Sequence, residues 1–247
     1  MNTPLTPMPD DWKQALAIVA HPDDLEYGAA SAIARWTGEG RSVAYVMVTD
    51  GEAGIDGMPP AEAAVLRRQE QVTSAAIVGV DDVTFLGYPD GVVEYGLDLR
   101  RAITREIRRV HPDILITATP ALTLRMGGGR RFLNQADHRA VGVAVLDAAR
   151  DAANRWIFPQ LLVEGLDPWP GATDVYLMGA EDPTHGVDVT DSLPLGIASL
   201  RAHRAYLDGL GRDFDPEAFL QAITTRSGAA LGVPNAVAFG RVQLQGV

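Results

Sequence analysis

The stretch ALAIVAHPDDLE, residues 15–26, decides the fold of this chain of 247 residues. Its first six residues are an apolar run of the length that is typical of a strand buried on both faces of a sheet. Its last six residues hold one imidazole and three carboxylates. Ligands of open α/β sheets bind beyond the carboxyl ends of the strands. The stretch therefore predicts a buried strand that leads directly into a functional loop.

Strand-like apolar runs and amphipathic helical segments alternate along the first half of the chain. We expect strands at 15–20, 42–49, 83–86 and 114–118, and helices at 27–38, 61–79, 97–110 and 136–151. The less regular second half predicts strands at 161–163, 175–177 and 237–244, and helices at 192–207 and 216–228. This alternation predicts βαβ units, and therefore an α/β fold with a mostly parallel sheet and helices on both faces. No linker divides the chain, so we expect a single domain over residues 1–247, with residues 1–10 as a loose N-terminal arm.

The composition excludes several classes of protein. The formal net charge of −11 argues against broad nucleic-acid binding, because that function needs a basic face. No apolar stretch is long enough to span a membrane, and residues 1–10 lack the features of a secretory signal. We therefore expect a cytoplasmic protein with a small-molecule partner, and homo-oligomerisation is compatible with the sequence. Cysteine is absent, so a metal ion would need histidine and carboxylate ligands.

The charged groups of the loop at 21–26 point to a metal ion, because burying them together is unfavourable unless a cation balances their charge. Catalytic zinc sites typically take three protein ligands and leave one position open. The loop offers His21 and one aspartate. His138 is the candidate third ligand, because it begins the helix after strand 114–118 and so lies at the same edge of the sheet. The spare aspartate can then serve as general base while water attacks an amide carbonyl.

A structural interpretation of the same loop is equally compatible with its spacing. An aspartate after a strand often caps the following helix, and His-Pro-Asp can form a simple turn. A nucleotide-binding protein is disfavoured, because no Gly-x-Gly-x-x-Gly follows the first strand. The loop alone therefore leaves a metal site and a plain turn open.

Five motifs in a fixed order narrow the choice. They are Ala20–Glu26 (AHPDDLE), Val48–Gly51 (VTDG), Arg67–Glu70 (RRQE), Leu86–Gly91 (LGYPDG) and Asp137–Gly142 (DHRAVG). With these motifs the chain resembles, over roughly residues 15–207, the LmbE-like or PIG-L family of N-deacetylases. The resemblance implies a Rossmann-like α/β fold. It also implies a hydrolase that uses Zn²⁺ to remove an N-acyl group, typically N-acetyl, from a sugar-like or small-metabolite amide such as an N-acetylglucosamine derivative.

The resemblance also implies roles for individual residues. By it, the zinc ligands are His21, Asp24 and His138, the general base is Asp23, Asp137 orients a catalytic imidazole, and Arg67 and Asp90 line the substrate pocket. Any one of these motifs is weak evidence, whereas their order along one chain is specific.

One position departs from the family pattern. Relatives often carry His-x-Asp-His where this chain has Gln135-Ala136-Asp137-His138. An amide can donate a hydrogen bond to an oxyanion but cannot supply a titratable proton, so Asp23 would act as both base and acid. We expect a slower enzyme, or one with an altered pH profile. The alternative is a metal-binding but inactive relative that serves as a binding module.

Three further side chains give weaker indications. Arg125 begins a Gly- and Arg-rich segment at 125–131 and is a candidate contact for an anionic substrate, because guanidinium groups suit carboxylates and phosphates. A solvated loop explains this segment equally well. Trp169, between two prolines, is a candidate sugar-stacking residue, and His203 is expected to pack on its helix or lie at the surface.

Overall fold

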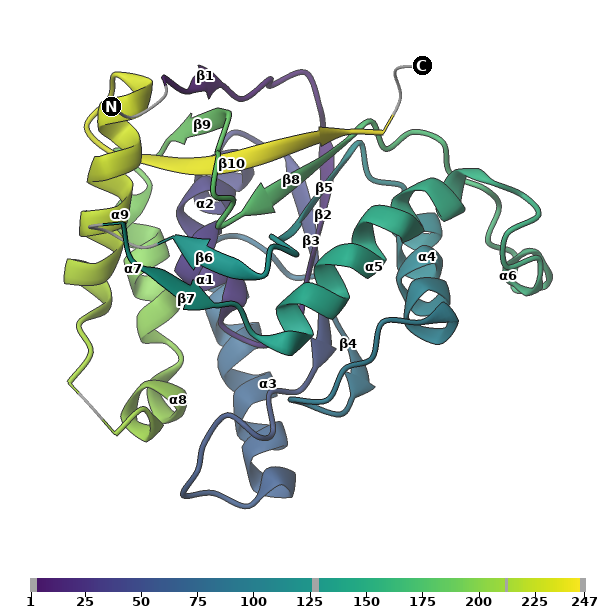
Figure 1. The fold of residues 1–247 in the computed structure, drawn as a ribbon, viewed down its shortest axis with the longest axis horizontal. Helices are drawn as coiled ribbons and strands as arrows, with labels where there is room; N and C mark the ends of the chain where they lie inside the picture. The colour runs from purple at the N-terminus through teal and green to yellow at the C-terminus, as the bar shows by residue number, and fades with distance from the viewer. Residues whose placement is uncertain (1–3, 126–128, 212, 245–247) are drawn as a thin grey trace.

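An eight-stranded sheet forms the centre of the protein in the computed structural model (Figure 1), which describes residues 4–125, 129–211 and 213–244. The strands lie in the order β1-β9-β10-β8-β5-β2-β3-β4. They are β1 (Thr6–Pro7), β2 (Gln14–Val19), β3 (Ser42–Thr49), β4 (Val83–Tyr88), β5 (Ile114–Ala118), β8 (Asp174–Met178), β9 (His185–Asp188) and β10 (Ala236–Gln243). The five strands from β8 to β4 run parallel, whereas β10 is antiparallel to β8 and β9. The predicted Rossmann-like α/β fold with a mostly parallel sheet is confirmed.

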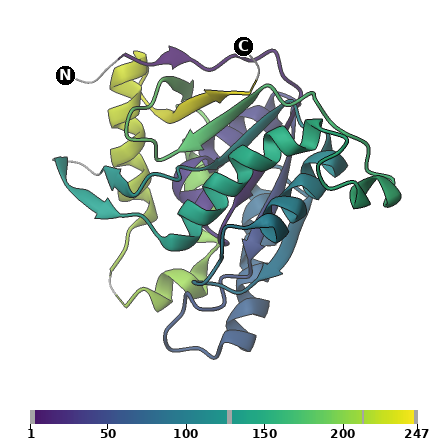
Figure 2. The ribbon, with the colours of Figure 1, turned by 45° about the vertical axis from the view of Figure 1, so that its right-hand side comes forward.

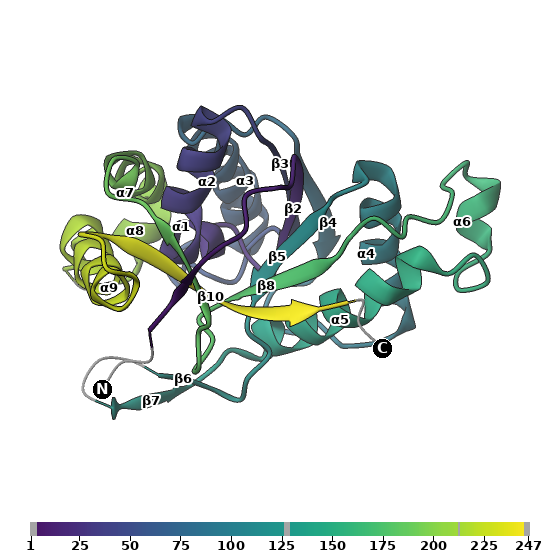
Figure 3. The same cartoon turned by 90° about the horizontal axis from the view of Figure 1, so that it is seen from above.

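Helices cover both faces of the sheet, as the view from above shows (Figure 3). One layer holds α1 (Asp24–Gly28), α2 (Ala30–Gly38), α3 (Pro60–Ile77), α7 (Leu193–Arg201) and α9 (Pro216–Leu231). The opposite layer holds α4 (Leu97–Val110) and α5 (Ala136–Ala153), and the short α6 (Gln160–Val163) lies on a projecting loop. The remaining short helix, α8 (Arg204–Gly209), contacts α3.

Strand β2 lies in the middle of the sheet, and its position explains why the run at 15–20 is apolar throughout. Ala17 and Val19 face the hydrophobic core under α2, whereas Leu16 and Ile18 face the core under α4 and α5. All four side chains are fully buried. A strand covered on both faces reads as a continuous apolar run rather than as an alternating one.

Two predicted elements differ from the structure. Residues 161–163, which we predicted as a strand, belong to helix α6. A run of three apolar residues fits a strand or a helix turn, so periodicity cannot separate them. The single helix predicted at 192–207 is divided into α7 and α8, with His203 between them. This break is what turns α8 back against α3.

Residues in two other parts of the chain form strands that the sequence did not predict. Thr6–Pro7 form β1, which pairs in parallel with β9, and Leu5 is buried. The expectation of a loose arm is therefore wrong for this part, while residues 1–3 lie outside the described residues. The segment at 125–131 connects β6 (Thr123–Arg125) and β7 (Arg131–Leu133) of a hairpin that projects from the body (Figure 2), with residues 126–128 outside the described residues.

The parallel strands place the functional loop. The carboxyl ends of β2, β3, β4 and β5 lie at one edge of the sheet, and the loops that follow β2 and β4 carry the predicted site residues. Helix α5 begins beside this edge (Figure 1). Over the described ranges, no helix has the length and apolar character to cross a membrane. The predictions of one domain, a cytoplasmic location and homo-oligomerisation stay predictions.

Candidate metal and active site

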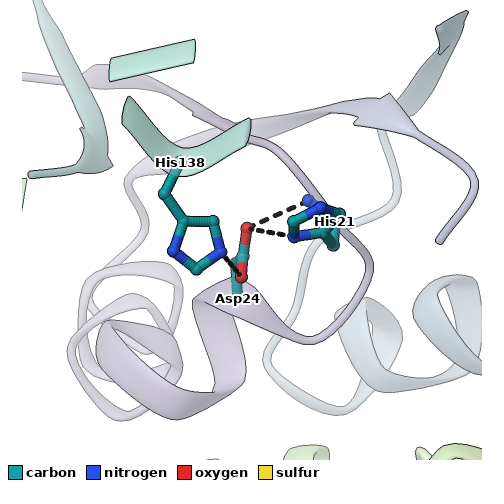
Figure 4. A group of neighbouring side chains, drawn as sticks. All are labelled: His21, Asp24 and His138. Carbon is teal, nitrogen blue, oxygen red and sulfur yellow. Dashed lines mark hydrogen bonds and ion pairs between the residues drawn. The ribbon is translucent and has the colours of Figure 1, made fainter. Parts of the chain in front are cut away.

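Two histidines and one aspartate from distant parts of the chain meet at this edge (Figure 4). Asp24 begins α1, directly after the loop that follows β2, and its Oδ2 accepts a hydrogen bond from the His21 backbone N–H at 2.9 Å. The same oxygen lies 3.6 Å from His21 Nδ1, and Asp24 Oδ1 lies 3.0 Å from Nε2 of His138. His138 stands in the first turn of α5. The structure therefore brings together the three residues that we predicted as metal ligands.

In both imidazoles, the ring nitrogen that does not face Asp24 lies close to hydrogen-bond acceptors. His21 Nε2 lies 3.0 Å from Asp90 Oδ1 and 3.3 Å from Asp137 Oδ2. Nδ1 of His138 lies 3.0 Å from the side-chain oxygen of Asn134. Metal-binding histidines characteristically give their second ring N–H to a carboxylate or carbonyl in this way. Each ring thus keeps its other nitrogen for the space around Asp24.

One buried atom supports the fit of a cation in that space. Nε2 of His138 is shielded from solvent and makes no aligned hydrogen bond, although Asp24 is its neighbour. Two imidazole nitrogens and a carboxylate converge there, which is a donor set that suits zinc. These residues fit a divalent metal ion.

Asp90 and Asp137 form a second acidic group around His21, but their oxygens already accept other hydrogen bonds. Asp90 Oδ2 accepts from the backbone N–H of Ala53 at 2.8 Å. Asp137 accepts from the backbone N–H groups of Gly91 at 2.7 Å and Val93 at 3.1 Å. The two carboxylates therefore hold His21 from behind. The imidazole that Asp137 contacts is that of His21, and Asp90 faces the same ring.

The carboxylates also control the protonation of the imidazoles. Burial disfavours a charged His21, but Asp24, Asp137 and Asp90 outweigh that cost and raise the pKa of His21 to about 12. Burial likewise opposes a charged His138, and Asp24 again outweighs it, so the pKa of His138 is raised. The pocket strongly favours positive charge, which a metal cation would supply in place of the protons.

Asp23 occupies a left-handed backbone conformation, with φ of 91°. For a residue other than glycine such a conformation costs on the order of 1–3 kcal/mol, and it persists only where the surroundings impose it. Helix α3 supplies these surroundings. Arg67 donates from one guanidinium nitrogen to Asp23 Oδ2 and to the Pro22 carbonyl, both at 2.5 Å. Gln71 accepts from the Asp23 backbone N–H at 2.9 Å.

The carboxyl group of Asp23 has the properties of a general base. Burial raises its pKa to about 7, although the charge of Arg67 opposes the rise. A pKa near the working pH is what general base catalysis requires. Arg67 is only 2% exposed and its guanidinium packs on the ring of Tyr206 at 4.4 Å. In this structure Arg67 therefore contacts the carboxylate of Asp23, the predicted general base, rather than open solvent.

Within the described residues, two predicted site residues have no side-chain hydrogen bond to this cluster. Gln135 is the N-cap residue of α5, three positions before His138, and its exposed side chain makes no capping hydrogen bond. Arg125 is exposed in β6 and, within the described part of the chain, has no hydrogen bond or ion pair to the cluster. Their predicted roles stay predictions.

Trp169 does not stand at the site, so the expectation of a sugar-stacking residue is wrong. Its indole N–H donates to the Pro112 carbonyl at 2.7 Å, and its ring stacks on His111. Both partners precede β5, at the edge of the sheet opposite to the site. His203 is fully buried, in agreement with a packed histidine, but it lies at the break between α7 and α8 rather than within a helix, with Nε2 3.7 Å from a Glu26 carboxylate oxygen.

Sequence reasoning missed two residues that hold the site in place. Asn134 lies just before the N-cap of α5, and its side-chain oxygen is 3.0 Å from Nδ1 of His138, so it supports that imidazole. Gln71 follows Arg67 by four positions, so both side chains leave the same face of α3. For Gln71, the helical spacing from the predicted site residue Arg67 was the available signal.

The mostly parallel sheet and the His–Asp–His cluster at its carboxyl edge define an α/β protein with a candidate metal centre of the kind that hydrolases use. Residues 16–149, more than half of the chain, match the family of the GlcNAc-PI de-N-acetylase, PIG-L. The chain therefore belongs to this family, and the resemblance found in its motifs is confirmed.

Named relatives agree with this assignment. The chain is 29% identical over 198 residues to the diacetylchitobiose deacetylase of Thermococcus kodakarensis, covering 79% of this chain and 71% of that protein. It is 28% identical over 214 residues to a Bacillus subtilis protein named probable N-acetyl-alpha-D-glucosaminyl L-malate deacetylase 2, covering 82% and 87%. Its fold matches the N,N'-diacetylchitobiose deacetylase from Pyrococcus horikoshii with a TM-score of 0.83 and 28% identity, covering 94% and 84% of the chains. These relatives are deacetylases, so the predicted enzyme class is confirmed.

Proposed function

We propose that this protein is a zinc-dependent N-deacetylase that hydrolyses the N-acetyl amide of a sugar-like small molecule. The observation that carries the proposal is the meeting of His21, Asp24 and His138 beside the buried carboxylate of Asp23. The relatives act, by their names, on diacetylchitobiose and on an N-acetylglucosaminyl malate. N-acetylglucosamine derivatives are therefore the proposed substrate class.

The roles follow from the positions of the side chains. Bound at His21, Asp24 and His138, zinc supplies Lewis-acid chemistry for water and for the amide carbonyl. Asp23 takes a proton from the attacking water and returns it to the leaving amine, so that acetate and a free amine result. A carboxyl group with a pKa of about 7 can serve in both directions near neutral pH.

The remaining residues orient these groups or meet the substrate. Asp137 and Asp90 fix the ring of His21, and Arg67 fixes the carboxylate of Asp23. The amide of Gln135, at the start of α5, is the proposed hydrogen-bond donor to the oxyanion. Arg125, on the projecting hairpin, is the proposed contact for an anionic group of the substrate.

A direct assay tests this proposal. The zinc-loaded protein is incubated with N,N'-diacetylchitobiose, N-acetylglucosamine and N-acetylglucosaminyl malate, and free amine is measured. We expect amine release from at least one of these compounds, its loss after chelation and its return when zinc is added. Full activity in the chelated protein would contradict the role of zinc.

The side chain of Gln135, which is exposed and makes no capping hydrogen bond, favours one alternative function, a metal-binding module without turnover. The same assay separates the two functions. A protein that holds stoichiometric zinc and binds an N-acetylated sugar, yet releases no amine from any of the three compounds, would support the binding module.

A further inference from the structure

One face of α3 carries a row of buried polar side chains that point at the loop of the site. Arg67, Gln71 and Ser74 follow one another at helical spacing, and none is more than 2% exposed. Polar groups this deeply buried need hydrogen-bond partners, and their partners are the loop residues Asp23 and Glu26. The row therefore connects the interior of α3 to the residues on either side of Asp24.

Gln71 is the centre of this row, because its one amide binds two parts of the loop. Its Oε1 accepts from the Asp23 backbone N–H at 2.9 Å, and its Nε2 donates to Glu26 Oε1 at 3.0 Å. A backbone N–H can only donate and a carboxylate can only accept, so the two partners fix which way the amide faces. A carboxylate at this position would satisfy Asp23 but repel Glu26, and an apolar side chain would satisfy neither.

The backbone N–H that Asp23 donates to Gln71 belongs to a residue in a strained backbone conformation. Asp23 has a φ of 91°, and Gln71 is the side chain that holds its backbone N–H in that conformation. Asp24 is held differently, by the His21 backbone N–H and by the imidazole of His138. The proposed base and the proposed ligand are neighbours in the chain, yet only the base depends on Gln71.

We infer that Gln71 is a positioning residue of the reaction. By bridging Asp23 and Glu26 it keeps Asp23 in its left-handed conformation, and so sets the placement of the base carboxylate without taking part in metal binding. This inference rests on the proposed deacetylase function. It names Gln71 as a residue that affects the rate of the chemical step while it touches neither the metal ligands nor the substrate.

Replacing Gln71 with methionine tests the inference, because Gln71→Met keeps the length of the side chain and removes both hydrogen bonds. A misplacement of about 1 Å can lower a rate about 100-fold, so we expect kcat to fall by about that factor. KM and the zinc content are expected to stay at the wild-type values. The matched control is Gln69→Met, on the solvent face of the same helix, which is expected to leave all three quantities unchanged.

Exchanging the two side chains of this contact distinguishes a loss of positioning from a simple folding defect. Gln71→Glu alone opposes two buried carboxylates and is expected to lower kcat. Gln71→Glu combined with Glu26→Gln restores one amide and one carboxylate across the same contact, and is expected to recover most of the lost kcat. Failure of the double variant to recover kcat, in a protein of wild-type thermal stability, would overturn the inference.

Amide hydrogen exchange at Asp23 in the metal-free protein gives a readout that does not need activity. Gln71→Met is expected to remove the protection of this amide, while Gln69→Met preserves it. Wild-type kcat in Gln71→Met, or a rise in KM alone, would overturn the inference. If the wild-type protein released no amine from any substrate, the proposed function would fail instead, and unchanged protection at Asp23 would then overturn the inference about Gln71.

Discussion

Asp23 and Asp24 are consecutive residues that belong to two different parts of the molecule. Asp24 is held by the sheet edge and α5, through the backbone of His21 and the imidazole of His138. Asp23 is held by α3, through the guanidinium of Arg67 and the amide of Gln71. The proposed metal ligand and the proposed general base therefore depend on different supporting elements, and mutations should separate the two roles.

We call Asp24 and the groups that hold it the ligand side, and Asp23 and the groups that hold it the base side. The largest expected effect comes from a mutation on the ligand side. Asp24→Ala removes the carboxylate that lies between His21 and His138, and leaves their nitrogens without a shared anion. We expect loss of bound zinc and a fall in kcat/KM of roughly 10³-fold or more, since both the metal and its charge stabilisation are lost. Elemental analysis and the amine assay measure these two quantities. Stoichiometric zinc in the purified variant would show that Asp24 is not a ligand.

The next effect lies on the base side. Asp23→Asn keeps the shape of the side chain and removes its capacity to take a proton, so we expect kcat to fall about 10²–10⁴-fold. Zinc content is expected to stay stoichiometric, because no metal-ligand atom is altered. Loss of zinc from this variant would instead assign Asp23 to the metal and end the separation between the two sides.

Asp90 tests how far the ligand side extends. Asp90→Asn keeps an acceptor for His21 Nε2 but removes the negative charge behind that ring. Removing such support typically costs about 10–100-fold in metal affinity, and we expect the weaker end of that range with near-normal kcat at saturating zinc. Competition with a chelator measures the affinity. A rise in KM with unchanged zinc affinity would favour the substrate-lining role that the sequence predicts.

Proton release should accompany zinc binding. The pKa of His21, raised to about 12, keeps this imidazole protonated at neutral pH in the metal-free protein, and the raised pKa of His138 favours its protonated form, so zinc must displace protons. Zinc affinity should therefore fall as the pH falls. Without metal, the stabilising effect of these charged imidazoles is fully present below a pH of about 6.5 and is lost as the pH rises through the folded-state pKa values. Calorimetry in buffers of different ionisation enthalpy would reveal the released protons, and an identical heat in all buffers would contradict this prediction.

Much of the ligand side could be predicted from the sequence, because its signals are local. The apolar run at 15–20 indicates a buried strand, and the charged loop follows that strand directly. His138 could be assigned to the same edge from the order of strands and helices. These inferences need only the periodicity of each segment and the rule that parallel strands end on one side.

The base side was harder to predict, because its contacts join segments that are far apart in the chain. The bridge that Gln71 forms between Asp23 and Glu26 depends on the rotation of α3 against the loop. The break between α7 and α8 coincides with a buried contact between His203 and Glu26, which no local sequence pattern predicts. Where packing between distant elements decides the outcome, propensity and periodicity carry little information.

The short strand β1 has a consequence for how the sheet ends. An exposed edge strand offers unpaired N–H and C=O groups, to which strands of other chains can add. Here Thr6 and Met8 donate backbone hydrogen bonds to Thr184 and Gly186, so the first strand covers the open side of β9. β1 has only two residues, and Pro7 has no N–H to offer a further strand. Strand β1 thus disfavours the addition of strands from other chains at this edge of the sheet, and so disfavours edge-to-edge aggregation there.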